Sequence, residues 1–562
     1  MLMKARQCLA AVLSVLLLTT VTACNGGPAS PSSEQRPPSE AATSTAASTA
    51  ASTTETTSGE TGETEPSSEE TSPTESESKP SRSPIKNPST ATTTTTTTIK
   101  KPVKYMYQFS DAARVYLSNS RSTFVRQNDA FKIYSKKNLD ASTGLIVEFD
   151  ANVTEHEIEG FGGAMTDTSA QMLSALPEKT REMLMEKLFD AEKGIGLSMI
   201  RGCVGSSDFA TEYYTYDDMP EGEEDWDLKH FDMSYDHKQI IPLMKDAMAI
   251  NKNIKFLLSP WTPPLWMKTN YKWQGSSGAM LRVDCYDVYA QYLVKTIQGY
   301  EAAGIPIYAL TIQNEPQGRV GWPGCIWDGD QMADFISISL RPAMNANGIT
   351  SKLWAWDHNY ADYLFPLTIL AQCKDDIDGI AWHWYDGTPE QMKEVSDYYE
   401  DVPMYITENG TAIGTFDNQL REMASGCVRA LRSGARNYIT WNLALDLKGG
   451  PTYNNINNGC SGIIRFDETG ENIQYTAEYF GFAHFSKFIH VGAKVVTSTD
   501  TGAATKYNQV NLVTRNPNGS MTAVLVNNEK TEKVFKLVMG DQVMEVPIAG
   551  RSVITVTWDA NA

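Results

Sequence analysis

The feature that most constrains the fold is an alternation of short apolar segments with amphipathic helical stretches, which begins at about residue 156. The apolar segments have the nearly continuous apolar composition expected of parallel strands buried on both faces. They are GFGGAMTD (160–167), GLSMIRG (196–202), IKFLLSPW (254–261), IYALTIQNEP (307–316), KLWAWDH (352–358), DGIAWHWY (378–385), PMYITENG (403–410) and NYITWNLAL (437–445). Stretches such as 177–189 and 285–300 lie between them and predict helices. Eight β–α units in succession predict an α/β fold, a (β/α)8 TIM barrel over residues 156–489.

A doubly wound parallel sheet is the alternative arrangement of the same elements. That fold commonly carries a glycine-rich phosphate-binding loop between a strand and a helix. The chain offers no such loop in a credible strand–turn–helix setting. The barrel is therefore the favoured architecture.

Strand-like runs flank the barrel on both sides. After residue 490 the runs KVVTST, QVNLVTRN, MTAVLVNN, KVFKLVM and RSVITVTW alternate with turn residues, which predicts a β-sandwich over 490–562. The runs TFVRQ, FKIYS and LIVEF lie before the barrel, within 123–150. We therefore expect an all-β sandwich side domain that strands of an N-terminal segment, 103–155, also join.

The first 23 residues have the form of a secretory signal peptide. Basic residues (Lys4, Arg6) precede an apolar run, Leu9 to Leu18, which is too short for a comfortable transmembrane helix. The sequence Val-Thr-Ala before Cys24 resembles a bacterial lipobox, which implies cleavage before Cys24 and its lipidation. The alternative is an ordinary signal peptide followed by a chance cysteine. We expect an extracellular, cell-surface lipoprotein that its lipid attaches to the membrane.

Residues 24–102 consist largely of Ser, Thr, Pro and Glu and contain the unbroken run Thr92–Thr98. Such a segment has little apolar surface to bury and cannot offset the entropy lost on folding. It predicts a disordered linker, and the Thr-rich run invites glycosylation.

Charge and cysteine spacing exclude two classes of function. The 68 acidic and 48 basic residues give a formal net charge of −20, which disfavours nucleic acid as a partner. Six cysteines follow Cys24 at wide, irregular intervals with no CxxC or Cys/His cluster, so no metal site and no cofactor is expected. We expect these cysteines to be mostly buried thiols.

Two glutamates follow predicted strands at the end where barrel enzymes place their active sites. Glu315 follows the fourth strand in the sequence N-E-P, and Glu408 follows the seventh in T-E-N. Glycoside hydrolysis needs two carboxyl groups, one to protonate the leaving oxygen and one to act as nucleophile or base. A surface cap or an ion pair would explain one such glutamate alone. The pair at strands four and seven favours catalysis.

The motifs around these residues resemble glycoside hydrolase family 30, which includes glucosylceramidase and β-1,6-glucanases. The resemblance extends from about residue 156 to 492. It rests on EGFGGAMTD (159–167), SSDFA (206–210), YTYDD (214–218), SPWTPPLWMKTN (259–270), QNEP (313–316), HWYDG (383–387), TENG (407–410), WNLALD–GGP (441–451) and GFAHFSKFI–GA (481–493).

The resemblance implies a retaining mechanism in which Glu315 is the acid/base and Glu408 the nucleophile. It also implies substrate-binding residues: Asn314 at the sugar 2-hydroxyl, Asp208, Trp261 and Trp441 around the −1 subsite, Arg201 near the nucleophile, His383 and Tyr385 at the sixth strand, and Asn458. For His383 the alternative is a hydrogen-bonded core histidine. The loop 452–462 departs from the glucosylceramidase spacing, which leaves Asn458 the weakest of these assignments.

Two properties of the catalytic pair can be expected from its chemistry. Retention requires the two carboxyl groups to lie about 5–5.5 Å apart. Repulsion between like charges should raise the pKa of Glu315 while Glu408 is ionised.

The resemblance implies a substrate that is a β-glycoside in an oligosaccharide or polysaccharide. A lipid anchor with a long linker favours extracellular β-glucan, such as β-1,6-glucan. Glucosylceramidase, β-glucosidase and β-xylosidase activities are the alternatives within the family. A non-catalytic surface protein that binds glycans is the alternative from another class. A metal-dependent hydrolase that uses His383, Asp357 and His358 lacks a close-spaced ligand set. A monomer is expected.

Overall fold

The computed structural model describes residues 107–456, 459–501 and 510–559. The predicted signal peptide, Cys24, the linker and Asn458 lie outside the described residues. Within the described part, no helix is both long enough and apolar enough to span a bilayer.

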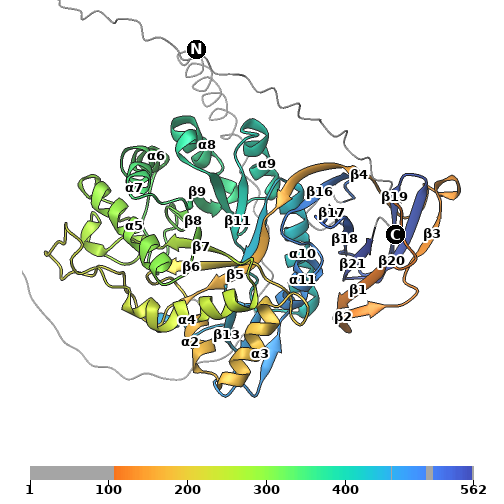
Figure 1. Cartoon of the computed structure of the whole chain (residues 1–562), viewed down its shortest axis with the longest axis horizontal. Coiled ribbons are helices and arrows are strands. Elements are labelled where there is room, and N and C mark those ends of the chain that lie inside the picture. The colour runs from red at the N-terminus through yellow and green to blue at the C-terminus, as the bar shows by residue number, and fades with distance from the viewer. Residues whose placement is uncertain (1–106, 457–458, 502–509, 560–562) are drawn as a thin grey trace, which may run out of the picture. The chain divides into compact units, whose positions relative to one another are not determined.

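All eight predicted strands form one parallel sheet (Figure 1). They are β5 (Gly160–Met165), β6 (Met199–Val204), β7 (Lys255–Pro260), β8 (Ile307–Thr311), β9 (Lys352–Asn359), β10 (Gly379–His383), β11 (Met404–Glu408) and β12 (Asn437–Thr440). The hydrogen-bonded order is β11-β10-β9-β8-β7-β6-β5-β12, so neighbours in the chain are neighbours in the sheet. The barrel prediction is confirmed.

The seam between β11 and β12 closes the barrel through two asparagine side chains. Asn437 Oδ1 accepts a hydrogen bond from the backbone N–H of Ile406 at 2.7 Å. Asn409 Nδ2 donates to the carbonyl of Ile439 at 2.5 Å. These amides pair one backbone N–H and one carbonyl at the seam, as ladder bonds would.

Helices follow the strands and cover the outside of the barrel. They are α2 (Asp167–Ala175), α3 (Glu178–Phe189), α4 (Ser234–Ile250), α5 (Tyr286–Ala302), α6 (Gly329–Phe335), α7 (Arg341–Ala346), α8 (Leu364–Cys373), α9 (Pro389–Tyr398), α10 (Phe416–Arg432) and α11 (Ala477–Ser486). In α10 the buried Leu420, Met423, Cys427 and Leu431 recur at helical spacing, so one face packs inward. A three-stranded sheet of β13 (Ala444–Asp446), β14 (Ile464–Phe466) and β15 (Ile473–Tyr475) follows β12.

The barrel interior is layered. One apolar layer contains Met199, Leu257, Ala309, Trp354, Ala381, Tyr405 and Ile439. Two residues further along the strands, the inward side chains become polar, because side chains on one face of a strand recur every second residue. They include Arg201, Ser259, Thr311, His383 and Thr407. A polar layer thus lies directly beneath the carboxyl ends of the strands.

A ten-stranded sheet from both ends of the chain forms the all-β side domain, as predicted. Its strands are β1 (Arg114–Asn119), β2 (Ser122–Gln127), β3 (Lys132–Ser135), β4 (Leu145–Ile158), β16 (Ala493–Ser498), β17 (Val510–Arg515), β18 (Ser520–Asn527), β19 (Lys533–Met539), β20 (Gln542–Ile548) and β21 (Ser552–Asp559). Their order is β2-β1-β21-β18-β17-β16-β4-β19-β20-β3. The long β4 leads through Glu159 directly into barrel strand β5. Helices α10 and α11 lie between the barrel and this sheet (Figure 1).

All six cysteines among the described residues are free thiols. Five are buried and Cys460 is partly buried, in agreement with the expectation of buried thiols.

Candidate active site

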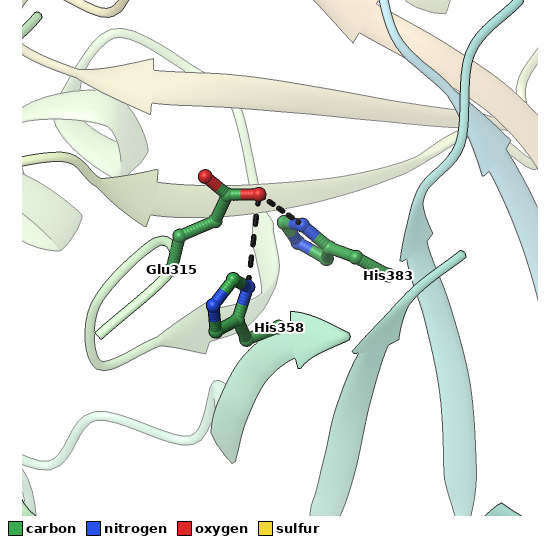
Figure 2. A group of neighbouring side chains, drawn as sticks. All are labelled: Glu315, His358 and His383. Carbon is green, nitrogen blue, oxygen red and sulfur yellow. Dashed lines mark hydrogen bonds and ion pairs between the residues drawn. The ribbon is translucent and has the colours of Figure 1, made fainter. Parts of the chain in front are cut away.

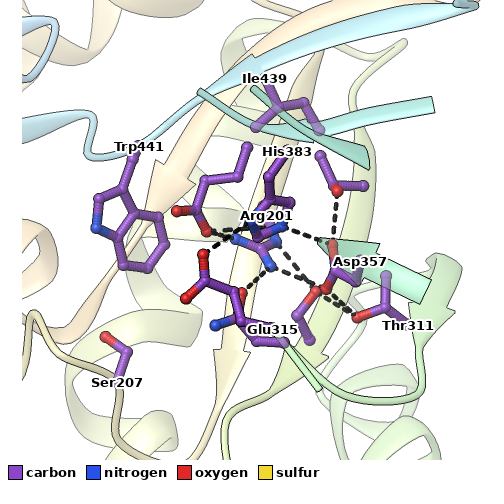
Figure 3. A network of polar contacts seen from close by, with 12 residues as sticks. Arg201, Ser207, Thr311, Glu315, Asp357, His383, Ile439 and Trp441 are labelled. Atoms are coloured by element: carbon purple, nitrogen blue, oxygen red, sulfur yellow. Dashed lines mark hydrogen bonds and ion pairs between the residues drawn. The ribbon is translucent and has the colours of Figure 1, made fainter. Parts of the chain in front are cut away.

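Arg201 is the centre of the polar layer (Figure 3). Its guanidinium donates to Glu408 Oε2, to Asn314 Oδ1 at 2.8 Å and to Asp357 Oδ2 at 2.9 Å. Its Nε donates to Ser259 Oγ at 3.0 Å. The side chain is fully buried, and a buried guanidinium requires such partners to offset its desolvation. Arg201 therefore orients residues from four different barrel segments.

Glu408 ends β11 and is held at both oxygens. Oε2 is paired with Arg201, and Oε1 accepts a hydrogen bond from Tyr385 Oη at 2.8 Å. His383 Nε2 lies 4.0 Å from Oε2. The guanidinium of Arg201 and the hydroxyl of Tyr385 therefore fix the orientation of the Glu408 carboxyl group.

Glu315 lies just beyond β8, in the left-handed backbone region at φ 47°. A non-glycine residue in that region carries strain of a kind that concentrates at functional sites. Its Oε1 is 3.4 Å from His383 Nδ1 and 3.7 Å from His358 Nδ1 (Figure 2). The carboxyl group of Glu315 therefore faces two imidazole rings.

The prediction of a raised pKa for Glu315 is wrong for this structure. Burial alone would raise it, but the hydrogen bond and charge of His383, followed by the charges of His358 and Arg201, outweigh burial and lower the pKa. The prediction considered only repulsion from Glu408 and left out the cations that surround Glu315.

His383 holds the proton of this network. Burial alone would lower its pKa, but the charge of Glu408 and the bonds to Asp357 and Glu315 raise it to about 9. Its Nε2 is 3.0 Å from Asp357 Oδ1, which leaves Nδ1 facing Glu315. In the free protein Glu315 and His383 together carry one titratable proton, and that proton rests on the imidazole.

Asp357 is a site residue whose role the sequence did not indicate. It accepts hydrogen bonds from Thr311 at 2.7 Å and Thr407 at 2.5 Å, besides those of Arg201 and His383. Although burial alone would raise its pKa, Arg201 and His383 hold it well below its usual range. Asp357 therefore forms an ion pair with each of the two cations, Arg201 and His383.

A cavity of about 470 Å³ opens above this layer. Its lining includes these predicted residues: Asp208, Trp261, Asn314, Glu315, Tyr385, Glu408 and Trp441. The rings of Trp261 and Trp441 are stacked with centroids 5.2 Å apart, and the Arg201 guanidinium is 4.9 Å from the Trp261 ring. Aromatic walls beside polar groups suit the apolar faces and hydroxyls of a sugar ring.

Two predicted substrate-binding residues lie beneath the cavity. Arg201 and His383 are both fully buried and are not among the described residues that line it. They contact the carboxyl groups of Glu315 and Glu408 and thereby orient them. Trp322 and Cys460 line the cavity and had not been singled out from the sequence, in which no neighbouring motif marks them.

Glu315, His358 and His383 could together hold a metal ion, since their ligand atoms lie within 4.8 Å of one another. His358 Nδ1 is buried and has no hydrogen-bond partner among the described residues. The sequence analysis named His358 and His383 as possible ligands but did not join Glu315 to them, because the three residues come from different strand ends. A metal ion there would occupy the carboxylate oxygen through which Glu315 exchanges a proton, so the two roles are mutually exclusive.

Residues 158–489 match the model of the glycosyl hydrolase family 30 TIM-barrel domain. Over 434 residues the chain is 29% identical to endo-1,6-beta-D-glucanase BGN16.3 of Trichoderma harzianum, covering 74% of this chain and 86% of that protein. It is 28% identical to lysosomal acid glucosylceramidase of Mus musculus, over 74% of this chain and 84% of that protein. The solved structure of the endo-beta1,6-glucanase BT3312 superposes with a TM-score of 0.69 at 27% identity, over 79% of this chain and 99% of that one.

Proposed function

The chain belongs to glycosyl hydrolase family 30 and is a glycoside hydrolase, and from that premise we propose that it cleaves β-1,6-glucan with retention of anomeric configuration. The observation that carries the mechanism is the pair of carboxyl groups in one cavity with different partners. Glu408 is held by Arg201 and Tyr385, whereas Glu315 faces a protonated His383.

In the first step Glu408 attacks the anomeric carbon and forms a covalent bond to it. The bond between that carbon and the glycosidic oxygen breaks, and the oxygen leaves with a proton from Glu315. In the second step Glu315 removes a proton from a water molecule, whose oxygen attacks the same carbon. The bond to Glu408 breaks, and the sugar leaves with its original configuration.

The proton for the first step comes from the Glu315–His383 pair. In the free enzyme it rests on His383. A sugar that fills the cavity displaces water and lowers the local polarity, which disfavours a charged pair relative to a neutral one. Substrate binding therefore moves the proton from His383 Nδ1 to Glu315 Oε1, across the 3.4 Å contact. Asp357, hydrogen-bonded to Nε2, keeps the imidazole oriented for this exchange.

The choice of β-1,6-glucan rests on relatives rather than on pocket geometry. Both the fungal endo-1,6-beta-D-glucanase and the solved endo-beta1,6-glucanase share most of this chain's length. The similarity to mouse glucosylceramidase supports glucosylceramide as the second candidate substrate. We further propose that the protein acts outside the cell, attached by lipid at Cys24, because an anchored enzyme with a long linker is suited to insoluble polysaccharide.

The test is hydrolysis of an aryl β-glucoside, an aryl β-xyloside, a linear β-1,6-glucan, a β-1,3-glucan and glucosylceramide by the wild type and by Glu408→Ala. We expect the β-1,6-glucan to be cleaved with the highest kcat/KM and the variant to be inactive. Preferential cleavage of glucosylceramide would replace the proposed substrate. Binding of glycan without cleavage of any substrate would overturn the proposed catalysis.

A further inference from the structure

A second cavity, of about 520 Å³, adjoins the catalytic cavity. It is bordered by α9, α10 and the segments that follow β10 and β11, and Asn528 of the side domain also lines it. Tyr385 and Gly410 line both cavities. The two spaces therefore share a wall formed by these two residues.

The lining of this cavity combines aromatic and polar groups as a sugar-binding site does. Trp384 donates its indole N–H to the carbonyl of Gly410 at 3.2 Å, which fixes the ring. Helix α10 also packs against the Trp384 ring, so closely that a Cβ atom added to Gly426 would lie 2.9 Å from it. A fixed indole beside Tyr385, which is 47% exposed, offers flat apolar surface for a pyranose.

The polar groups point to an uncharged ligand. Arg429 is neutralised by Glu390, at 2.6 Å, and the charge of Glu422 acts on Arg421. Arg421 Nε is nevertheless buried and has no hydrogen-bond partner among the described residues. A buried donor of this kind costs free energy unless a ligand or water accepts from it. A neutral molecule rich in hydroxyl groups would fit a lining whose charges are already paired.

We propose that this cavity is a second glycan subsite, which binds further sugar units of the same β-glucan chain whose scissile bond lies in the catalytic cavity. The inference rests on the proposed function, since it takes β-glucan as the substrate. Its position also gives it an effect on catalysis. A sugar packed against Tyr385 restricts the ring whose hydroxyl holds Glu408 at 2.8 Å. Long substrates should therefore be favoured over short ones.

The test is to fill the cavity from α10 with Asn418→Trp. Asn418 is exposed and lines the cavity, and its side chain contacts Arg421 at 2.8 Å. Asn345→Trp, on the exposed face of α7, is the matched control. The readout is the ratio of kcat/KM for a linear β-1,6-glucan to kcat/KM for an aryl β-glucoside, which fills only the catalytic cavity. We expect the ratio to fall about five- to tenfold in Asn418→Trp and to stay at the wild-type value in the control.

A second variant, Arg421→Gln, removes the guanidinium that bonds Asn418 and Asn528 without filling the cavity, and it should lower the ratio about threefold. The two variants together keep the test informative if one of them folds poorly. An unchanged ratio in the folded variants, with both substrates still cleaved, overturns the second subsite and leaves the proposed function intact. Failure of the wild type to cleave either substrate overturns the proposed function and this inference with it.

Discussion

Each end of the barrel contains at least one buried carboxylate beside cations, and the two clusters differ in their balance of charge. At the amino ends of the strands, Glu159 faces three cations: Lys255 at 3.4 Å, Arg436 at 3.6 Å and Lys352 at 3.7 Å. Tyr308 and Tyr405 donate hydroxyl hydrogen bonds to the same carboxylate. At this end one acid is surrounded by positive charge.

At the carboxyl ends the proportions are reversed. Three acids, Glu315, Asp357 and Glu408, share one guanidinium and the protonated His383. Glu159 and Glu408 are each 6% exposed, so burial alone does not separate the two clusters. The two glutamates differ in that Glu408 lines a cavity and has fewer cations close to its carboxylate. A cluster beside a cavity in which carboxylates outnumber cations is typical of a catalytic site. A single carboxylate surrounded by cations is typical of a structural ion-pair cluster.

The largest expected effect is the loss of activity in Glu408→Gln, compared with Glu159→Gln. Removing the nucleophile should lower kcat for β-glycoside hydrolysis by at least about 10³-fold, because the covalent bond of the proposed mechanism forms on Glu408. Glu159→Gln should leave the kcat of the folded protein within about threefold of wild type, since its end of the barrel is away from the chemistry. Equal losses in the two variants would contradict this division of roles.

Asp357→Asn should have the next largest effect. The amide cannot compensate Arg201 and His383, so Glu315 and Glu408 lose their fixed orientation, and kcat/KM should fall about 100-fold. The pH dependence separates this role from mere destabilisation. Because Asp357 helps to hold the proton on His383, the alkaline limb of kcat/KM should move to lower pH in the variant. A fall in activity with an unchanged limb would show that Asp357 does not act through His383.

Stability should depend on pH through His383. Its pKa in the folded protein is about 9, above the ordinary value of 6.5, so the stabilisation is complete below about pH 6.5 and is lost as the pH rises through 9. Urea unfolding should show this loss, of about 2–3 kcal/mol, between pH 6.5 and 9. The loss should be absent in His383→Gln. If the free energy of unfolding changed equally with pH in both proteins, the pH dependence would come from groups other than His383.

The smallest expected effect is that of Lys255→Met at the amino end. Lys352 and Arg436 remain beside Glu159, and the lysine side chain is 23% exposed, so the free energy of unfolding should fall by only about 1 kcal/mol. The same urea titration measures it. A loss of several kcal/mol would mean that the cluster depends on all three cations rather than on any two.

Much of the fold could be predicted from the sequence because its signals are local. Continuous apolar runs marked all eight barrel strands, and strand ends marked Glu315 and Glu408. Strands β1 and β20 of the side domain were missed, as were the short β14 and β15 that follow the barrel strands. In β20 Pro547 breaks the strand pattern, and a proline is tolerated in a strand only where its missing N–H is not needed.

The network beneath the cavity could not be predicted, because it depends on backbone detail in β9. Simple alternation from the inward Trp354 would direct Trp356 inward and Asp357 outward. Trp356 and Asp357 instead have positive φ angles of 78° and 69°, and the register shifts beside them. This bulge turns Asp357 into the barrel, between Arg201 and His383. Bulges near active sites commonly redirect a side chain in this way.

The most direct test of the proposed mechanism is the anomeric configuration of the first product. Proton NMR can follow hydrolysis of a β-1,6-linked gluco-oligosaccharide by the wild-type enzyme before the product mutarotates. A covalent intermediate on Glu408 predicts that the β-anomer appears first and the α-anomer only later. Initial release of the α-anomer would mean that water attacks directly, and would contradict the assignment of Glu408 as nucleophile.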